Sequence, residues 1–394
     1  MRRVSSVLVA LATLALVTGC EKKTQPATPK SSGQASTAPA ANANVVLFGE
    51  VGSLTGAQAT FGISTRNGIE MAIDEANKEG GIKGKPIQIK VYDDMGRPEE
   101  AANAATRLIN EDHVKVILGE VASTNSLAMA DKANASQVPM ISPSSTNPKV
   151  TQNRPYVFRV CFIDPFQGFV MAKFAHDHLH LNKVAVLKDQ KSDYSIGLSN
   201  VFTRKFSEMG GQITTTEAYS QGDSDFRAQL TAIKRTAPQA VYVPGYYNDV
   251  GLIARQAREL GLTVPLLGGD GWESSRLYEL GGSAIDGSYY SNHYSSEDPS
   301  PRVQQFITAY RQRFGEVPDS LAALGYDAAK VAVDAMRRAP DLTGPAVRDA
   351  IAQTKDFPGV AGTITLDAQR NAVKPAVVLK IEDGKSHYVT TVSP

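Results

Sequence analysis

The sequence has very little cysteine: Cys20 and Cys161 are the only two in 394 residues. Two cysteines this far apart exclude a Cys-x-x-Cys metal site, and an exported domain that contains only Cys161 cannot close an internal disulfide. Cys161 lies within the apolar run 156–162, which predicts a small, buried side chain.

The chain also lacks an excess of either charge, with 41 Lys and Arg residues against 40 Asp and Glu residues. This balance implies no polyanionic partner, so we expect no binding to nucleic acid. The composition, 42% hydrophobic and 21% charged, is typical of a globular protein, and the length is sufficient for two hydrophobic cores.

Motifs of the common enzyme classes are missing. The sequence contains no G-x-G-x-x-G, no G-x-x-x-x-G-K-[ST] and no G-x-S-x-G. His176, His178 and His180 form a cluster, of which the first and last are one helical turn apart and could suit a metal. No third ligand for such a pair is evident, and a solvated helix end is the simpler interpretation. We therefore expect no enzyme activity, no cofactor and no metal site; an exported hydrolase is the alternative.

No apolar run near the N-terminus is long enough to span a bilayer as a stable helix. A basic start precedes an apolar run over 7–17, and small residues then lead to Cys20. This order predicts a secretion signal over 1–19. Residues 20–44 are rich in Lys, Thr, Gln, Pro, Ser and Ala, which predicts a disordered linker.

The end of the signal, Leu16-Val-Thr-Gly-Cys20, resembles a bacterial lipobox, in which the cysteine becomes the lipidated first residue of the mature chain. The lipobox favours Leu three residues before the cysteine, and Val17 is a tolerated departure. An ordinary signal peptide is the alternative. Several acyl chains make a stable membrane anchor, so the resemblance implies that Cys20 tethers the protein to a membrane.

From Val45 the chain alternates apolar strands with amphipathic helices. The first series of strands is predicted over 45–51, 87–92, 114–118 and 138–142, and a second series runs from 183 to 268. Such alternation predicts parallel sheets with right-handed crossovers, covered by helices on both faces. Two series predict two lobes.

The order of elements changes after Asp286. A short strand over 287–291 is followed by two long helices with apolar residues at helical spacing, which indicates core packing. Further along, the segments 362–367 and 376–381 are predicted to pair as antiparallel strands.

Open doubly wound sheets bind ligands where strands end and helices begin. Ser123 follows the third predicted strand, and Ser144 and Thr146 follow the fourth. Hydroxyl groups and free backbone N–H groups at such a place suit a carboxylate, although each segment taken alone is better described as a helix cap or a turn.

The second series has strand ends of its own. Tyr194 precedes a helix, Tyr246 follows a glycine, and Asp270 lies among three glycines. A carboxylate flanked by glycines is open to a ligand, and it needs a cation if a cleft closes over it. A turn-forming aspartate is the alternative for Asp270.

Several short motifs occur in an order that is more specific than any one of them. They are Ser53-Leu-Thr-Gly56, Gly80-Gly-Ile-Lys-Gly84, Tyr92-Asp-Asp94, Ser142-Pro-Ser-Ser-Thr146, Asp193-Tyr194, Gly245-Tyr246 and Gly268-Gly-Asp-Gly271. From Val45 to about Ile381 the chain resembles the branched-chain amino-acid (Leu/Ile/Val-type) binding proteins that feed ABC importers. The resemblance implies an α/β, type I periplasmic binding protein fold, with two doubly wound parallel-sheet lobes joined by a three-crossing hinge.

The resemblance also implies where the lobes lie in the sequence. The first lobe would comprise about 45–163 plus 292–371, and the second about 164–291 plus 372–394. The late helices would return to the first lobe, which accounts for the third crossing.

The resemblance assigns roles to the residues at the strand ends. Ser123, Ser144 and Thr146 match positions that receive the ligand α-carboxylate and, through a carbonyl or hydroxyl group, its α-ammonium. Asp270 matches an acidic residue that pairs with the ammonium. The aromatic residues complete the ligand-binding set: the opposite wall would be formed by Tyr194 and Tyr246, and the ligand side chain would be met by Phe61.

Two departures from the family pattern matter. Archetypal members carry a disulfide near these loops, but the matching positions here are about Gly96 and Ala122. Glu120 stands beside the carboxylate loop: a solvent-facing charge is the simpler interpretation, while a cleft-facing one would admit a ligand with a second cationic or polar group.

The function implied is that of a lipid-anchored, extracytoplasmic binding protein in the periplasm or outside the cell. It would capture a branched-chain or other apolar amino acid and deliver it to the membrane permease of an ABC importer, as a monomer. A sensory lipoprotein, and a ligand that is a related amide or small carboxylate, are the alternatives. The identity of the ligand and the membrane that holds the anchor stay open.

Overall fold

The computed structural model describes residues 44–394. The predicted signal peptide, Cys20 and the predicted linker up to residue 43 lie outside these described residues. Within 44–394, no helix combines the length and the apolar character needed to cross a membrane.

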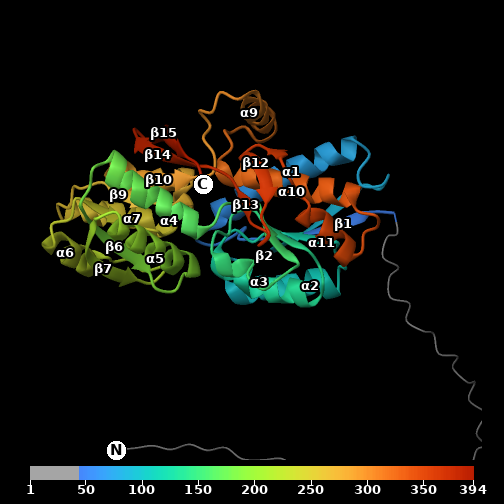
Figure 1. Cartoon of the computed structure of the whole chain (residues 1–394), viewed down its shortest axis with the longest axis horizontal. Coiled ribbons are helices and arrows are strands. Elements are labelled where there is room, and N and C mark those ends of the chain that lie inside the picture. Colours follow the sequence, from blue (N-terminus) through green and yellow to red (C-terminus); the bar gives the residue numbers. More distant parts are fainter. Residues whose placement is uncertain (1–43) are drawn as a thin grey trace, which may run out of the picture. The chain divides into compact units, whose positions relative to one another are not determined.

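The first lobe is built on a five-stranded parallel sheet of order β2-β1-β3-β4-β5 (Figure 1). Its strands are β1 (Val46–Gly52), β2 (Ile87–Asp93), β3 (Val116–Leu118), β4 (Met140–Ser142) and β5 (Val157–Arg159). The helices between them are α1 (Ala59–Lys78), α2 (Pro98–Asn110), α3 (Ser123–Ala135) and the short η1 (Pro148–Val150).

The second lobe is built on a seven-stranded sheet of order β15-β14-β10-β9-β8-β6-β7, in which only β14 and β15 run antiparallel to their neighbours. Its strands are β6 (Lys183–Asp189), β7 (Gln212–Tyr219), β8 (Ala240–Tyr242), β9 (Leu266–Gly268), β10 (Tyr289–Asn292), β14 (Ala376–Glu382) and β15 (Lys385–Val392). Its helices are α4 (Asp164–Lys173), the π-helical η2 (Phe174–His178), α5 (Asp193–Glu208), α6 (Arg227–Arg235), α7 (Tyr247–Glu259), η3 (Asp270–Trp272), α8 (Ser275–Gly281) and η4 (Gly282–Ile285).

The chain passes between the two sheets three times: after β5, after β10 and before β14. After the second passage come α9 (Pro301–Phe314), α10 (Ser320–Arg338) and α11 (Gly344–Ala352). Figure 1 shows α10, in orange, beside the blue α1 of the first lobe. The two helices can approach closely because Gly68 has no Cβ atom. A Cβ atom at this position would lie 2.0 Å from the carbonyl oxygen of Ala322. The late helices therefore belong to the first lobe.

The predicted antiparallel pairing of 362–367 with 376–381 is wrong. A separate three-stranded sheet contains β11 (Phe357–Gly359), β12 (Gly362–Leu366) and β13 (Ala372–Val373), whereas β14 pairs with β10 and β15. The residues after β13 are Lys374 and Pro375, and a proline has no N–H group for a sheet. The chain changes lobe at this point, so β12 and β14 end in different sheets.

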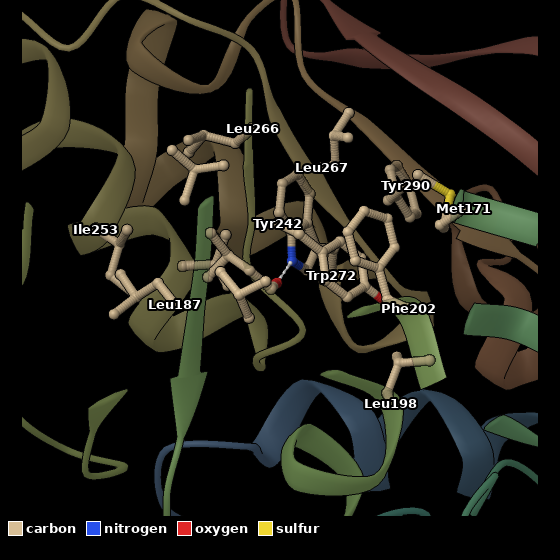
Figure 2. Packing of buried hydrophobic residues seen from close by; sticks show 14 of the residues in the cluster. Met171, Leu187, Leu198, Phe202, Tyr242, Ile253, Leu266, Leu267, Trp272 and Tyr290 are labelled. Atoms are coloured by element: carbon tan, nitrogen blue, oxygen red, sulfur yellow. Dashed lines mark hydrogen bonds between the residues drawn. The ribbon is translucent and has the colours of Figure 1, made fainter. Parts of the chain in front are cut away.

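The core of the second lobe surrounds Trp272 (Figure 2). The indole Nε1–H donates to the carbonyl oxygen of Val243 at 3.0 Å, and the ring stacks on Tyr290 with centroids 6.1 Å apart. A Cβ atom at Gly268 would lie 2.0 Å from the indole, so only glycine fits at the end of β9. The residues just before Trp272 are therefore held in a fixed position.

Candidate functional site

Six of the seven predicted ligand-binding residues line one small cavity between the lobes. They are Phe61, Ser123, Ser144, Tyr194, Tyr246 and Asp270, and the remaining walls are formed by Val121, Gly271 and Leu321. The cavity measures about 10 Å³, which is close to the least space that holds one water molecule. The lobes are closed in this structure, and a larger ligand requires them to separate.

The carboxylate of Asp270 is buried and receives hydrogen bonds on both oxygens. Its Oδ1 accepts from Gln167 Nε2 at 2.7 Å and from the hydroxyl of Tyr194 at 3.0 Å. Its Oδ2 lies 3.0 Å from His293 Nε2 and 3.5 Å from the hydroxyl of Ser144. Four donors match the needs of an ionised carboxylate, which can only accept.

His293 does not supply a positive charge to Asp270. Burial lowers the pKa of His293 to about 4, even though its hydrogen bond to Asp270 acts in the opposite direction. The imidazole is therefore neutral at pH 7, and its ring stacks on Phe162 with centroids 3.7 Å apart. Asp270 thus faces the cavity with neutral hydrogen-bond donors around it and, among residues 44–394, no cationic side chain bonded to it.

The turn that carries Asp270 packs tightly against Tyr194. The N–H of Gly271 donates to the hydroxyl of Tyr194 at 3.2 Å, and a Cβ atom at Gly269 would lie 2.4 Å from that hydroxyl. The glycines predicted to leave Asp270 open to a ligand are therefore also required for its contact with Tyr194. Trp272 fixes the other end of the turn in the core.

The first lobe presents a helix N-terminus to the cavity. The helix α3 begins at Ser123, so Ser123 lies in its first turn. The hydroxyl of Ser123 accepts the N–H of Asn147 at 3.3 Å, which joins α3 to the loop after β4. The first N–H groups of a helix have no partner within the helix and favour an anion.

Hydrogen bonds from Arg159 fix the backbone of the loop 142–148. This arginine is fully buried and lies at the end of β5, where the chain first passes between the lobes. Its guanidinium donates to the carbonyl of Ser145 and, at 2.8 Å, to the carbonyl of Asn147. With these carbonyls directed toward Arg159, the Ser144 side chain is held at the cavity.

Aromatic rings from both lobes form the apolar wall. Tyr194 and Tyr246 stack with centroids 5.3 Å apart and an interplanar angle of 9°. Phe61, on α1 of the first lobe, meets Tyr246 edge-on at 5.7 Å and Tyr247 at 5.0 Å. Leu321, at the start of α10, completes the apolar part of the lining.

Thr146 is fully buried and is not part of the cavity lining. Its backbone carbonyl accepts the N–H of Asp164 at 2.9 Å, which joins the loop to the start of α4 in the second lobe. The structure therefore places Thr146 behind the lining residues.

Glu120 does not face solvent, contrary to the simpler of its two sequence interpretations. Its side chain is 1% exposed and accepts the N–H of Ala122 at 2.6 Å and the hydroxyl of Ser53 at 3.2 Å. Burial raises the pKa of Glu120 well above its ordinary value, and the neighbouring Asp94 adds to the shift. Glu120 is absent from the cavity lining and instead connects the loops behind it.

Direct hydrogen bonds join the lobes around the cavity. Tyr247 donates its hydroxyl proton to the carbonyl of Ala57 at 2.7 Å, and Asn147 Nδ2 donates to the carbonyl of Asp193 at 2.7 Å. Glu273, three residues after Asp270, accepts the N–H of Ser320 at 3.2 Å. These bonds form only when the lobes meet, so they contribute to closure.

Besides Val121 and Gly271 of the lining, three residues at the site were not predicted from the sequence. Gln167 lies on α4 behind Asp270, Leu321 was interpreted as core, and His293 follows the end of β10. A search of every strand end would have found His293, because β10 is a parallel neighbour of β9. Gln167 carries no comparable signal.

The histidine cluster remains apart from this site. His176 Nδ1 lies 2.7 Å from Asp177, and His178 stacks on Phe174 at 4.7 Å. In the part of the chain that the structure describes, no group of three or more His, Cys, Asp or Glu residues could hold a metal ion.

Comparisons with known proteins identify what the chain is similar to. A family model described as periplasmic binding protein matches residues 29–385. The Leu/Ile/Val-binding protein homolog 2 of Brucella abortus is 31% identical over 350 residues, which cover 87% of this chain and 93% of that protein.

Solved structures show the same similarity. The leucine binding protein LivK of Thermotoga maritima is 40% identical with a TM-score of 0.86, and the match covers 89% of this chain and 99% of that one. The branched-chain amino acid transporter substrate binding protein LivJ of Streptococcus pneumoniae, solved in complex with isoleucine, is 32% identical with a TM-score of 0.84. That match covers 89% of this chain and 100% of the other.

Proposed function

Because the chain belongs to the periplasmic binding protein family, we propose that it captures a branched-chain or other apolar amino acid between its lobes and delivers it to an ABC importer. The similarity to a leucine-binding protein and to a protein solved with isoleucine supports this ligand class. No chemical step is involved, so the protein acts by binding and closure.

The observation that carries the proposal is the arrangement of charge across the cavity. On one side lies the buried carboxylate of Asp270, which has neutral donors in Gln167, Tyr194 and His293 and no cationic side chain bonded to it among the described residues. On the other side lie Ser144 and the N-terminus of α3 at Ser123, which suit an anion. A zwitterion with its ammonium toward Asp270 and its carboxylate toward α3 matches both sides.

The ligand side chain would lie against the aromatic wall. Phe61, Tyr246 and Leu321 provide apolar surface at the cavity, while the hydroxyl of Tyr194 is already bonded to Asp270. An aliphatic side chain gains about 25 cal/mol per Å² of apolar surface removed from water. We assign Thr146 to support of the loop through its backbone, since its side chain lies behind the lining.

Binding and closure would proceed in order. The ligand first meets Ser123 and Ser144 on the first lobe, and closure then brings Tyr194, Tyr246 and Asp270 onto it. Contacts made only in the closed state shift the population toward closure. The closed surface is the one that a membrane permease would recognise, and lipidation of Cys20 would hold the protein at the membrane.

A calorimetric titration of the purified exported domain tests the ligand class. Leucine, isoleucine and valine should bind and should stabilise the protein by ~2.7 kcal/mol at 100 times the dissociation constant. Arginine, glutamate, a small amide and a small carboxylate serve as comparisons. Binding of the small carboxylate or the amide with no response to any α-amino acid would overturn the amino-acid assignment.

Delivery to an importer needs a separate experiment. The closed, ligand-loaded protein should retain its permease on an affinity matrix, and the Cys20→Ser variant should be released from the membrane. If the affinity matrix captures a sensor protein in place of a permease, the protein is a sensory lipoprotein. If the Cys20→Ser variant stays at the membrane, Cys20 is not the lipid anchor.

A further inference from the structure

A second cavity lies at the hinge, on the other side of His293 from the ligand site. We define this hinge cavity by His293, Tyr294, Glu297, Val360, Pro375 and Tyr388, which are among its lining residues. It measures about 380 Å³, against about 10 Å³ for the ligand site by the same measure. This volume lies within the usual range for small-molecule sites.

The hinge cavity takes its walls from both lobes and from two of the three passages between them. His293 and Glu297 lie on the passage after β10, and Pro375 lies on the passage before β14. Val360 belongs to the first lobe and Tyr388 lies on β15 of the second. Because rotation of one lobe against the other must move these walls, the shape of the hinge cavity depends on closure.

A direct contact joins the hinge cavity to the ligand site. His293 lines the cavity and also places its Nε2 at 3.0 Å from Asp270 Oδ2. Since Asp270 is the acceptor, Nε2 carries the proton and Nδ1 is left as an acceptor. Nδ1 is buried and has no hydrogen-bond partner among the described residues, and the same holds for the hydroxyl of Tyr294.

The lining favours an apolar molecule that carries a protonated amine. Val360, Pro375 and the ring of Tyr388 are apolar, Nδ1 of His293 needs a donor, and the lining includes the exposed acidic residues Glu297 and Asp298. Glu297 already accepts the N–H of Tyr388 at 2.8 Å and lies 2.9 Å from His387 Nδ1. None of the lining residues is Lys or Arg. Lys374 is buried next to Pro375; its Nζ has no hydrogen-bond partner among the described residues, and Asp327 is its electrostatic partner.

We propose that the hinge cavity is a second binding site, for a small apolar amine, and that its occupant stabilises the closed state and so tightens amino-acid binding. The direction follows from the closed arrangement, in which both lobes contact the occupant. Coupling between two sites is reciprocal, so the amino acid must tighten amine binding by the same factor. The predicted coupling between amine binding and amino-acid binding rests on the proposed function. The binding of an amine in the hinge cavity does not.

The test uses phenethylamine as the probe, with phenethyl alcohol and phenylacetate as its neutral and anionic counterparts. Titration of leucine with and without saturating phenethylamine should show leucine binding about fivefold tighter when the probe is present. The alcohol should have a smaller effect and phenylacetate none. An equal effect of all three molecules would overturn the amine assignment, and a weaker affinity for leucine would show competition and overturn the second site.

Two variants locate the probe. Thr391→Trp, at an exposed position on β15 that lines the hinge cavity, should block the probe and leave leucine binding alone unchanged. Glu297→Gln combined with Asp298→Asn should weaken the binding of phenethylamine. Glu316 is an exposed glutamate outside the cavity, so Glu316→Gln should leave this binding unchanged. Undiminished binding of phenethylamine to Thr391→Trp would place it elsewhere and contradict the proposal.

Failure of the two proposals can be told apart. Phenethylamine is also titrated into the protein without leucine, so its binding to the hinge cavity is measured directly. If leucine alone does not bind, the proposed function fails but the hinge site is still tested. If leucine and phenethylamine both bind with no mutual effect, the coupling is disproved and the amino-acid function stands.

Discussion

At the scale of single residues, the site depends on the carboxylate of Asp270. Closure buries this carboxylate, and the ligand has to provide the cation that pairs with it. Asp270 is 5% exposed, and its charge is compensated by hydrogen bonds alone. Burying a charge in this way is unfavourable unless a cation joins it. The ligand ammonium would supply that cation.

Asp270→Asn should therefore weaken leucine binding by about 2–5 kcal/mol, roughly 30- to 5,000-fold in Kd. The substitution should weaken the binding of 4-methylpentanoate much less. This molecule lacks the ammonium group and therefore never forms the ion pair with Asp270. Calorimetry on both ligands gives the comparison, with the exposed Asp225→Asn as the matched control. Equal losses for the two ligands would remove the role assigned to Asp270.

A second residue, Glu50, makes the stability of the protein depend on pH. Glu50 lies on β1, and neither carboxylate oxygen has a hydrogen-bond partner among the described residues. Burial raises its pKa to about 8 in the folded protein, so the folded chain retains a proton that an unfolded chain releases near pH 4.5. The stabilisation is complete below pH 4.5 and is lost as the pH rises through 8.

Glu50→Gln should remove this loss. We expect the variant and the wild type to have similar stability near pH 4.5, and the variant to be more stable by on the order of 2–5 kcal/mol at pH 9. Urea unfolding at several pH values measures the difference. A difference between the two proteins that stays constant with pH would show that Glu50 is not the cause.

The sequence predicted much of the site at this scale, because strand ends can be recognised from the chain alone. Ser123, Ser144, Tyr194 and Asp270 were found in this way and line one cavity. The burial of Glu120 could not be predicted, since it results from hydrogen bonds to Ser53 and Ala122 that depend on how the loops after β1 and β3 meet.

At the scale of elements, the N-terminus of α10 forms part of the closure contact. Glu273 accepts the N–H of Ser320, the first residue of α10, and Asp319 caps the same helix by accepting the N–H of Ala322 at 2.9 Å. Tyr290 and Asn292 on β10 also donate to Glu273. Two carboxylates from different lobes therefore approach one helix end.

Leucine affinity should fall as the pH rises through 7. Burial, followed by the charge of Asp319, raises the pKa of Glu273 to about 7 in the closed state, and opening would return it toward that of an exposed glutamate. Closure thus takes up a proton, and its contribution is complete near pH 4.5 and lost above 7. We expect roughly fivefold to tenfold weaker binding at pH 8 than at pH 6.

Glu273→Gln tests the source of this dependence, because the amide can still accept hydrogen bonds but does not ionise. Leucine titrations at pH 6, 7 and 8 should give a flatter profile for the variant than for the wild type. Parallel profiles would assign the pH dependence to another group.

Local elements were predictable where apolar spacing is regular, and less so where tertiary contacts decide. The strands β1 and β2 were predicted within one residue of their observed bounds. Both β12 and β14 were recognised as strands from their composition, but their predicted pairing was wrong. The partner of each strand depends on where the chain changes lobe, which it does at Pro375.

At the scale of the whole molecule, the predicted family and the type I fold are confirmed by the family match and by two solved structures with TM-scores of 0.86 and 0.84. The alternation of strands and helices was sufficient to predict two parallel-sheet lobes. It could not indicate how closely they approach, which depends on side chains such as Phe61 and Tyr247 at their interface.

The closed arrangement should be the minor state without ligand, since closure leaves Asp270 buried with no cation bonded to it. Small-angle scattering should therefore show a smaller radius of gyration after leucine is added. The Asp270→Asn variant should be more compact than the wild type without ligand, because its buried side chain is neutral. A ligand-free wild type as compact as the loaded protein would contradict this expectation.

Trp272 provides a means to observe these events without a label. It is the single tryptophan of the chain, it follows Asp270 by two residues, and it is packed against Tyr290. Indole emission responds to nearby charge and polarity, so both ligand capture and lobe movement should change the fluorescence of the unmodified protein. Stopped-flow mixing could then resolve the encounter on the first lobe from the slower closure that follows it.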